Sequence, residues 1–192
     1  MLDALVRIID RLIELTKYRE ERFRRIFDKL IEPIYEDLKI IHRDYLEMFQ
    51  TVYDLLPKEE ADSAAEYTRQ LREAKRFLID KRKKYAPDRV RFEATAGAMW
   101  HKREAISKTV WPFISASLIY LSSNYDSLGF VGTGKDKKGA AASRSADLLR
   151  SIEDGDRDVR NFTSREIEHL GKRWEELSRL YAELRVLAQV GS

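Results

Sequence analysis

The sequence of 192 residues contains no cysteine, and this absence excludes several kinds of site. A chain without cysteine has no disulfide scaffold, no zinc thiolate site and no thiol nucleophile. It fits a reducing compartment, so we expect the protein to be cytoplasmic. Proline and glycine are also scarce, with only four and eight copies, and the chain therefore has few residues that interrupt helices.

Long hydrophobic runs are equally scarce. The first 20 residues carry charges every three or four positions, which is typical of an amphipathic helix and unlike a signal peptide. Residues 109–125 contain no charge, but this run has 17 residues with one proline and five Ser or Thr, which is marginal for spanning a bilayer. A central buried helix is the favoured interpretation. A membrane-inserting element and an aromatic protein interface are the alternatives.

Charged residues are abundant at 36%, and together with the helical spacing of apolar residues they predict the fold class. We expect an all-α fold, an elongated antiparallel bundle of four to six helices with coiled-coil-like packing in a single domain. A chain of this length buries enough apolar surface to fold without a metal or a disulfide.

Helix boundaries follow from prolines and from capping residues. Pro33 is expected to kink or break the first helix, and the sequence YAPD at 85–88 is expected to end a later one. Thr163 and Glu166 have capping-box spacing, which predicts a helix start at Ser164. The expected elements are a kinked helix or helix pair over 1–56, a basic helix over 57–85, a central helix over 88–122 that bends near Pro112, a flexible Gly/Lys loop over 124–142, a short helix over 143–153 and a C-terminal heptad helix over 164–190.

The C-terminal helix carries the clearest apolar pattern. Its apolar residues alternate spacings of three and four, which indicates a stripe that packs on a partner helix. A partner helix of the same chain is favoured, and a helix of another chain is the alternative. The stripe consists of Ile167, Leu170, Trp174, Leu177, Tyr181, Leu184 and Ala188.

The stretch GFVGTGKDKKG at 129–139 approaches the phosphate-binding loop of nucleotide hydrolases. Such a loop needs a strand before the first glycine and Ser or Thr after the lysine, whereas Asp136 follows Lys135 here. A mobile basic loop carrying Lys135, Lys137 and Lys138 is therefore the favoured interpretation.

Glu166 and His169 have the E-x-x-H spacing of di-iron helical bundles, but such sites need a second pair. Neither His42 nor His101 has a glutamate three residues earlier, and a solvated helix face is favoured. The sequence predicts no catalytic, metal or cofactor site and indicates that the protein is not an enzyme.

The strongest charge asymmetry lies in residues 69–91, which hold ten Lys or Arg against three Asp or Glu and hence a local charge of +7. Such a segment could contact phosphates of a nucleic acid or of an anionic membrane surface. Alternatively, it is a solvated helix face that pairs with acids of neighbouring helices, such as Glu59, Glu60 and Glu66. The candidate polyanion contacts are Arg69, Arg72, Lys75, Arg76, Lys81, Arg82, Lys83, Lys84, Arg89 and Arg91.

These features predict a non-enzymatic helical interaction protein, such as an accessory subunit or adaptor, that binds a protein partner or self-associates. A nucleic-acid-associated protein using the basic helix is the first alternative, and a membrane-associated protein using 109–125 is the second. The candidate protein-interface residues are Trp111, Phe113, Tyr120, Trp174 and Tyr181.

Overall fold

The computed structural model describes residues 2–15, 23–57, 63–101, 106, 108–121 and 141–190. Within these ranges the chain is helical apart from short turns and forms no strand. The helices are α1 (Leu2–Leu15), α2 (Phe23–Ile26), the π-helical turn η1 (Phe27–Ile31), α3 (Glu32–Leu55), α4 (Ala64–His101), α5 (Trp111–Leu121), α6 (Ala141–Glu153) and α7 (Val159–Val190).

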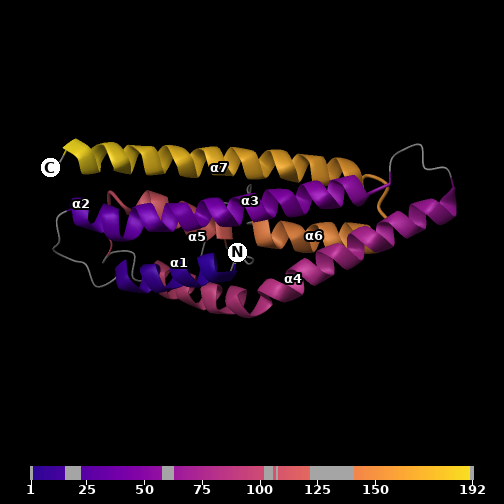
Figure 1. Ribbon diagram of the computed structural model, residues 1–192, viewed down its shortest axis with the longest axis horizontal. Coiled ribbons are helices and arrows are strands. Elements are labelled where there is room, and N and C mark those ends of the chain that lie inside the picture. The colour runs from indigo at the N-terminus through magenta and orange to yellow at the C-terminus, as the bar shows by residue number, and fades with distance from the viewer. Residues whose placement is uncertain are drawn as a thin grey trace.

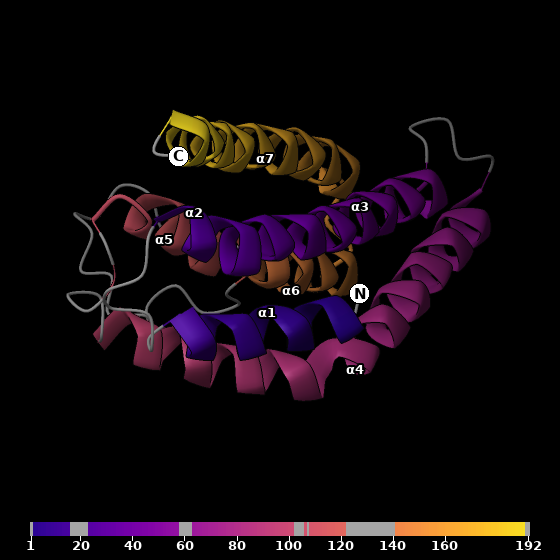
Figure 2. The same ribbon diagram turned by 60° about the vertical axis from the view of Figure 1, so that its left-hand side comes forward.

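Because α2, η1 and α3 are continuous, the described elements form six helical segments, within the predicted four to six. The bundle is elongated, with α7 antiparallel to α3 (Figure 1) and α4 on the opposite side of α3 from α7 (Figure 2). The predicted all-α bundle is thus confirmed. Its coiled-coil-like packing stays a prediction.

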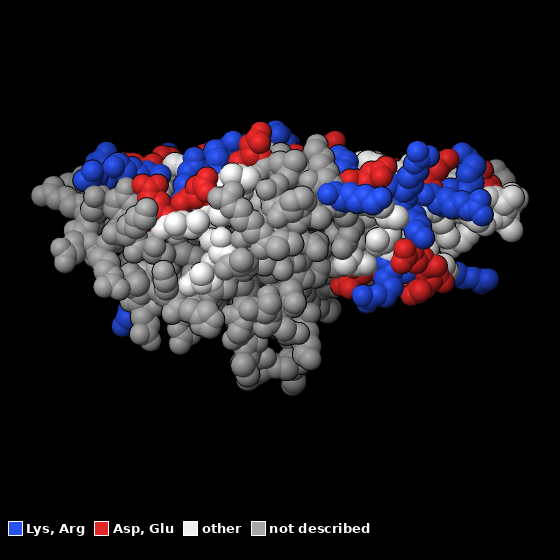
Figure 3. Space-filling model, turned by 90° about the horizontal axis from the view of Figure 1, so that it is seen from below, with Lys and Arg blue, Asp and Glu red and all other residues white. Residues whose placement is uncertain are grey.

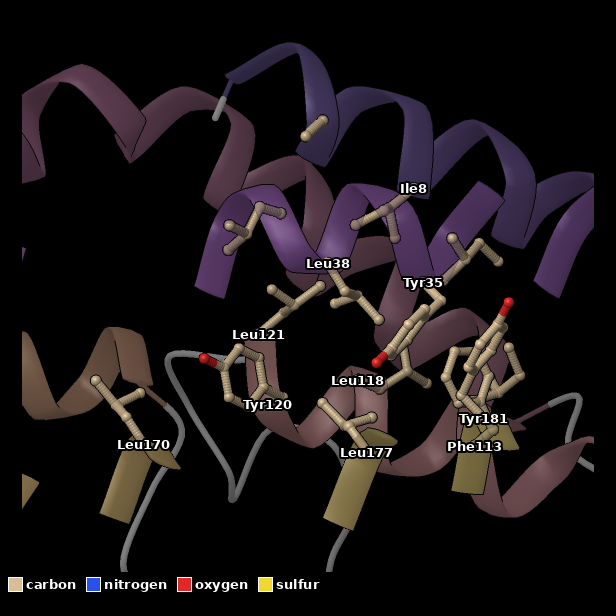
Figure 4. Close-up of a cluster of buried hydrophobic side chains, with 14 of the residues drawn as sticks. Ile8, Tyr35, Leu38, Phe113, Leu118, Tyr120, Leu121, Leu170, Leu177 and Tyr181 are labelled. Atoms are coloured by element: carbon tan, nitrogen blue, oxygen red, sulfur yellow. The ribbon is translucent and has the colours of Figure 1, made fainter. Parts of the chain in front are cut away.

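Helix α3 is the centre of the packing, because it contacts α1, α4 and α7. Buried side chains from α1, α3, α5 and α7 meet in one core cluster (Figure 4). The uncharged helix α5 is part of this core, since Phe113, Leu118 and Tyr120 are almost completely buried. Among the described residues no helix is long and apolar enough to cross a membrane.

Pro33 does not break the helix, although the sequence predicted a kink or a break there. Helix α1 ends at Leu15 and α2 begins at Phe23, whereas the chain stays helical through Pro33. In a regular α-helix the proline ring clashes with the carbonyl four residues earlier. The π turn η1 immediately precedes Glu32 and Pro33, and its wider winding accommodates the ring.

Helix α4 differs at both ends from the predicted 57–85 helix. It begins at Ala64, where Ser63 caps it by accepting a hydrogen bond from the Glu66 amide at 3.2 Å. It also continues through 85–88 to His101, so the predicted end at the YAPD sequence is wrong. One interior proline costs a single backbone hydrogen bond and commonly bends a helix without ending it. Both ribbon views show α4 bent along its length (Figures 1 and 2).

The predicted central helix over 88–122 is replaced by the end of α4 and by the separate helix α5. Pro112 does not bend α5 but lies in its first turn, where its missing amide proton has no intrahelical partner to lose. The predicted short helix over 143–153 is α6, which begins at Ala141.

Helix α7 begins at Val159, one turn before the predicted start at Ser164. Thr163 is not the cap, because its buried hydroxyl donates to the Val159 carbonyl at 2.7 Å inside the helix. The turn before the helix is held by the Asp156 carboxylate, which accepts from the Asp158 amide at 2.9 Å. The capping-box prediction is wrong because a threonine can equally bond back to the carbonyl four residues earlier.

Because α7 starts earlier, one of its first residues, Arg160, can hydrogen-bond to the C-terminal end of α3. Arg160 donates through Nη1 to the carbonyls of Tyr53 at 3.0 Å and Leu56 at 2.9 Å. Its guanidinium lies 3.9 Å from the centre of the Tyr53 ring, a cation–π contact. The final carbonyls of α3 thus find a partner on α7, which fixes the two antiparallel helices at this end of the bundle.

Candidate functional site

A column of stacked rings fills the interface between α3 and α7. The rings of Tyr35 and Tyr181 are 3.8 Å apart between centroids with an interplanar angle of 5°. Trp174 lies 5.3 Å from Tyr35 at 10°, and His42 lies 4.5 Å from Trp174 at 9°. Phe27 of η1 stacks on Tyr181 at 5.6 Å. Five rings therefore join the two helices by apolar burial and ring stacking.

Trp174 and Tyr181 of this column are two of the five predicted protein-interface residues. Phe113, Tyr120 and Tyr181 are buried in the core, and Trp111 and Trp174 are half-buried and pack against it. The aromatic side chains therefore pack within the chain, and the surface that they leave for a partner is small.

His42 and Tyr120 form a polar pair at one end of the column. Nδ1 of His42 and the hydroxyl oxygen of Tyr120 lie 2.7 Å apart, at hydrogen-bonding distance. Burial lowers the pKa of His42 and raises the pKa of Tyr120, because a buried site disfavours both charged forms. At neutral pH both side chains are thus neutral, and the pair holds α3 against α5.

Tyr181, which lies between Phe27 and Tyr35 in the column, makes a second polar contact. Its hydroxyl donates to Oε1 of Glu32 at 3.3 Å. Burial and the neighbouring Glu32 carboxylate raise the pKa of Tyr181 to about 12. Both titratable rings of the column that show a shifted pKa, His42 and Tyr181, thus have polar partners within the chain.

Two arginines of α1 converge on one buried carboxylate of α3, a site that the sequence did not indicate. Arg7 donates through Nε to Oδ1 of Asp37 at 2.9 Å, and Arg11 pairs with Oδ2. Arg11 also donates to the Pro33 carbonyl at 3.1 Å. Only 4% of the Asp37 surface is exposed. This cluster holds α1 on α3, and its members lie too far apart in sequence for any motif to reveal it.

The E-x-x-H pair on α7 has a different environment from the predicted solvated face. Glu166 is buried, with 4% of its surface exposed, and its Oε1 lies 3.4 Å from Nδ1 of the half-buried His169. No group of three or more metal-ligating side chains occurs in the part of the chain that the structure describes. The pair is therefore a contact within α7, one turn of helix apart.

Among the described cations of the basic segment of α4, some form an ion pair with a carboxylate and others form none with the described residues. It describes the side chains of Arg69, Arg72, Lys75, Arg76, Lys81 and Lys83, while those of Arg82, Lys84, Arg89 and Arg91 lie outside the described residues. Arg69 pairs with Glu66 at 2.6 Å and with Glu73 at 2.9 Å. Lys75 reaches Glu153 of α6 at 3.2 Å.

Lys81 is the third described cation of α4 with a partner, since its Nζ lies 5.4 Å from the centre of the Phe77 ring. Arg72, Arg76 and Lys83 are exposed and form no ion pair with the described residues. Blue and red side chains alternate over much of the described surface seen in Figure 3. Of the three acids named as possible partners of the basic segment, Glu66 does pair with a cation, Arg69. The other two, Glu59 and Glu60, lie outside the described residues.

The last two residues of the predicted Gly/Lys loop over 124–142 belong to α6, which begins at Ala141. Residues 122–140, which include Lys135, Lys137 and Lys138, lie outside the described ranges.

An apolar patch at the end of α7 was missed by the sequence analysis. Val186, Leu187 and Val190 have 57%, 48% and 79% of their surface exposed. Ile13 of α1 is the other large apolar side chain that is exposed among the described residues. The signal was present in the sequence, because these three positions fall outside the stripe that ends at Ala188. We call Val186, Leu187 and Val190 the α7 outer stripe.

Comparison with family models, with curated proteins and with solved structures finds no match to this chain. Its class is therefore the all-α helical bundle described above, and any function has to be argued from its own side chains.

Proposed function

We propose that this chain is a helical interaction protein that associates with a second copy of itself through the α7 outer stripe. The carrying observation is the exposure of Val186, Leu187 and Val190 on the last two turns of one helix. Grouped apolar side chains on a surface commonly mark protein–protein contacts.

The arrangement of the stripe supports a helical partner. Leu180 and Leu187 are one heptad apart, and Val190 follows Leu187 by three residues, which is the spacing of a coiled-coil seam. Leu180 packs against the core of the bundle. The α7 outer stripe therefore continues a line of apolar residues that begins at the edge of the core. A patch of this kind is apolar on both copies and is self-complementary in a two-fold dimer.

The small size of the stripe limits its affinity. Three side chains cover far less area than the interfaces of permanent dimers, so the association is weak and depends on concentration. The engagement of His42, Asp37 and Glu166 in contacts within the bundle supports an interaction role over a catalytic one.

Sedimentation velocity over protein concentrations from about 10 μM to about 1 mM tests this proposal, because weak dimers dissociate within that range. We expect the wild type to show a rising dimer fraction and the Leu187→Ser/Val190→Ser variant to stay monomeric. Ile13→Ser, which removes a similarly exposed apolar side chain from α1, is the control and should dimerise like the wild type. A wild-type protein that is monomeric at every concentration contradicts self-association.

A further inference from the structure

We infer that α4 carries a second binding surface that takes the phosphate backbone of a nucleic acid. This surface is a row of three cations that form no ion pair within the described part of the chain. The row consists of Arg72, Arg76 and Lys83. At 100° per residue these positions lie within about 40° of one another around the helix, and they extend over about 16 Å of its length. All three side chains are exposed.

The opposite face of α4 anchors the row to the bundle. Ala74 and Leu78 are completely buried, and Leu71 and Phe77 pack against the same core. Helix α4 also contacts α1, α3 and α6. The cations therefore stand on a helix whose orientation is fixed, so a ligand does not have to order the backbone when it binds.

The neighbouring cations on α4 differ from the row because they are already neutralised. Arg69 is held between Glu66 and Glu73, and Lys75 pairs with Glu153. Neither Arg72, Arg76 nor Lys83 has such a partner in the described part of the chain. Asp80 lies beside the row but forms no ion pair with Arg76 or Lys83, so a phosphate displaces no ion pair of the described residues when it binds.

The two guanidinium groups and the ammonium group of the row are suited to bind several phosphates along a nucleic-acid backbone. Guanidinium groups bind phosphate oxygens through two parallel hydrogen bonds, and ammonium groups bind them as point charges. A length of about 16 Å corresponds to about five base pairs of duplex, since the axial rise is 3.4 Å per pair. Contacts of this kind position a nucleic acid without reading its bases, so the binding is independent of sequence.

An anionic membrane would require a different helix surface. Helices that lie on membranes insert a large apolar face between the lipid headgroups. On α4 the apolar side chains Ala74 and Leu78 are buried within the bundle, and no large apolar side chain of α4 is exposed among those described. The row therefore suits a ligand that it contacts through charge alone.

Fluorescence anisotropy with a labelled duplex DNA of about 20 base pairs and a labelled single-stranded RNA of similar length tests the inference, because backbone binding weakens steeply with salt. Three phosphate contacts give a slope of log affinity against log salt of about −2.7 on duplex, which is an affinity loss of about 40-fold between 50 and 200 mM NaCl. In the variant Arg72→Gln/Arg76→Gln/Lys83→Gln we expect at least tenfold weaker binding at low salt and a correspondingly shallower slope.

The matched control removes three cations that already have partners. Arg165, Lys172 and Arg179 of α7 pair with Asp158, Glu168 and Glu183. The variant Arg165→Gln/Lys172→Gln/Arg179→Gln has the same net charge as the α4 variant, and we expect it to bind within about threefold of the wild type, since exposed paired cations contribute little. Circular dichroism verifies that both variants remain helical.

Three outcomes overturn the inference. One is the absence of binding to either nucleic acid at 50 mM NaCl, and another is equal loss of affinity in the two triple variants, which would indicate net charge alone. The third is binding to vesicles of phosphatidylcholine and phosphatidylserine without binding to nucleic acid, which would assign the row to a membrane. None of these outcomes bears on dimerisation through the α7 outer stripe, which sedimentation measures separately.

Discussion

Helices α4 and α7 are both long and rich in charge, yet they use their cations differently. On α7, Arg165, Lys172 and Arg179 each pair with an acid of the same chain. On α4, Arg72, Arg76 and Lys83 have no such partner among the described residues. Helix α4 has ten Lys or Arg against five Asp or Glu, whereas α7 has six against five. The excess of cations on α4 leaves a positive row among its described residues, and α7 is close to neutral.

The two helices also differ in how much apolar surface they expose, and here α7 exposes more than α4. Among the described residues α4 exposes no large apolar side chain, whereas α7 keeps an exposed apolar stripe beyond its packed face. The surface that distinguishes α4 is thus its positive row, and the one that distinguishes α7 is its exposed apolar stripe. This difference is the reason for assigning different ligands to the two surfaces.

The largest expected effect compares the packed face of α7 with the outer face of α4. Leu177 is 1% exposed, and its truncation in Leu177→Ala leaves a cavity that costs about 2–5 kcal/mol of unfolding free energy. Arg76→Ala on the outer face of α4 should change stability by less than about 0.5 kcal/mol. Urea denaturation followed by circular dichroism measures both. Equal losses would show that the outer face of α4 is packed as tightly as the inner face of α7.

The next effect compares a buried ion pair with the exposed ion pairs of α7. Asp37→Asn removes the carboxylate charge that holds two arginines of α1, and we expect a loss of about 1–3 kcal/mol. Glu183→Gln, the matched change at an exposed pair, should cost about 0.3–0.5 kcal/mol. Thermal unfolding at low and high salt separates them, because salt screens the exposed pair more strongly. A similar cost at both sites would contradict a stabilising role for Asp37.

The smallest expected effect is the pH dependence of stability that His42 causes, since its ring is half-buried against Trp174 of α7. Burial lowers the pKa of folded His42, whereas the unfolded chain titrates at about 6.5. Below that pH the unfolded chain takes up the proton more readily, so acidification favours unfolding. We expect the unfolding free energy to fall from about pH 7.5 to about pH 5.5, and to fall less in His42→Asn, as measured by urea denaturation at each pH. Identical pH dependence in both proteins would exclude His42 as the cause.

Sequence patterns predicted the fold class well because apolar periodicity reports directly on helix faces. The stripe from Leu170 to Ala188 is buried as expected, with Trp174 half-buried. Helix ends were predicted less well, because Thr163 can cap a helix or bond within one, and because a proline can begin, bend or end a helix.

Partners that are distant in sequence could not be predicted at all. Tyr35 and Tyr181 stack across 146 positions of sequence, and Asp37 meets Arg7 across 30. Composition likewise cannot distinguish an aromatic residue of the core from one of an interface. The structure makes that distinction, because it buries Phe113 and Tyr181 and exposes Leu187.

The central claim is that α4 and α7 carry two independent binding surfaces. Sedimentation velocity of the protein with a fluorescein-labelled duplex, detected at both protein and dye wavelengths, reports dimerisation and DNA binding in one experiment. We predict that Leu187→Ser/Val190→Ser remains monomeric and binds the duplex like the wild type, and that Arg72→Gln/Arg76→Gln/Lys83→Gln dimerises and sediments without the dye. Loss of both activities in either variant, or of neither activity in both, would contradict the claim.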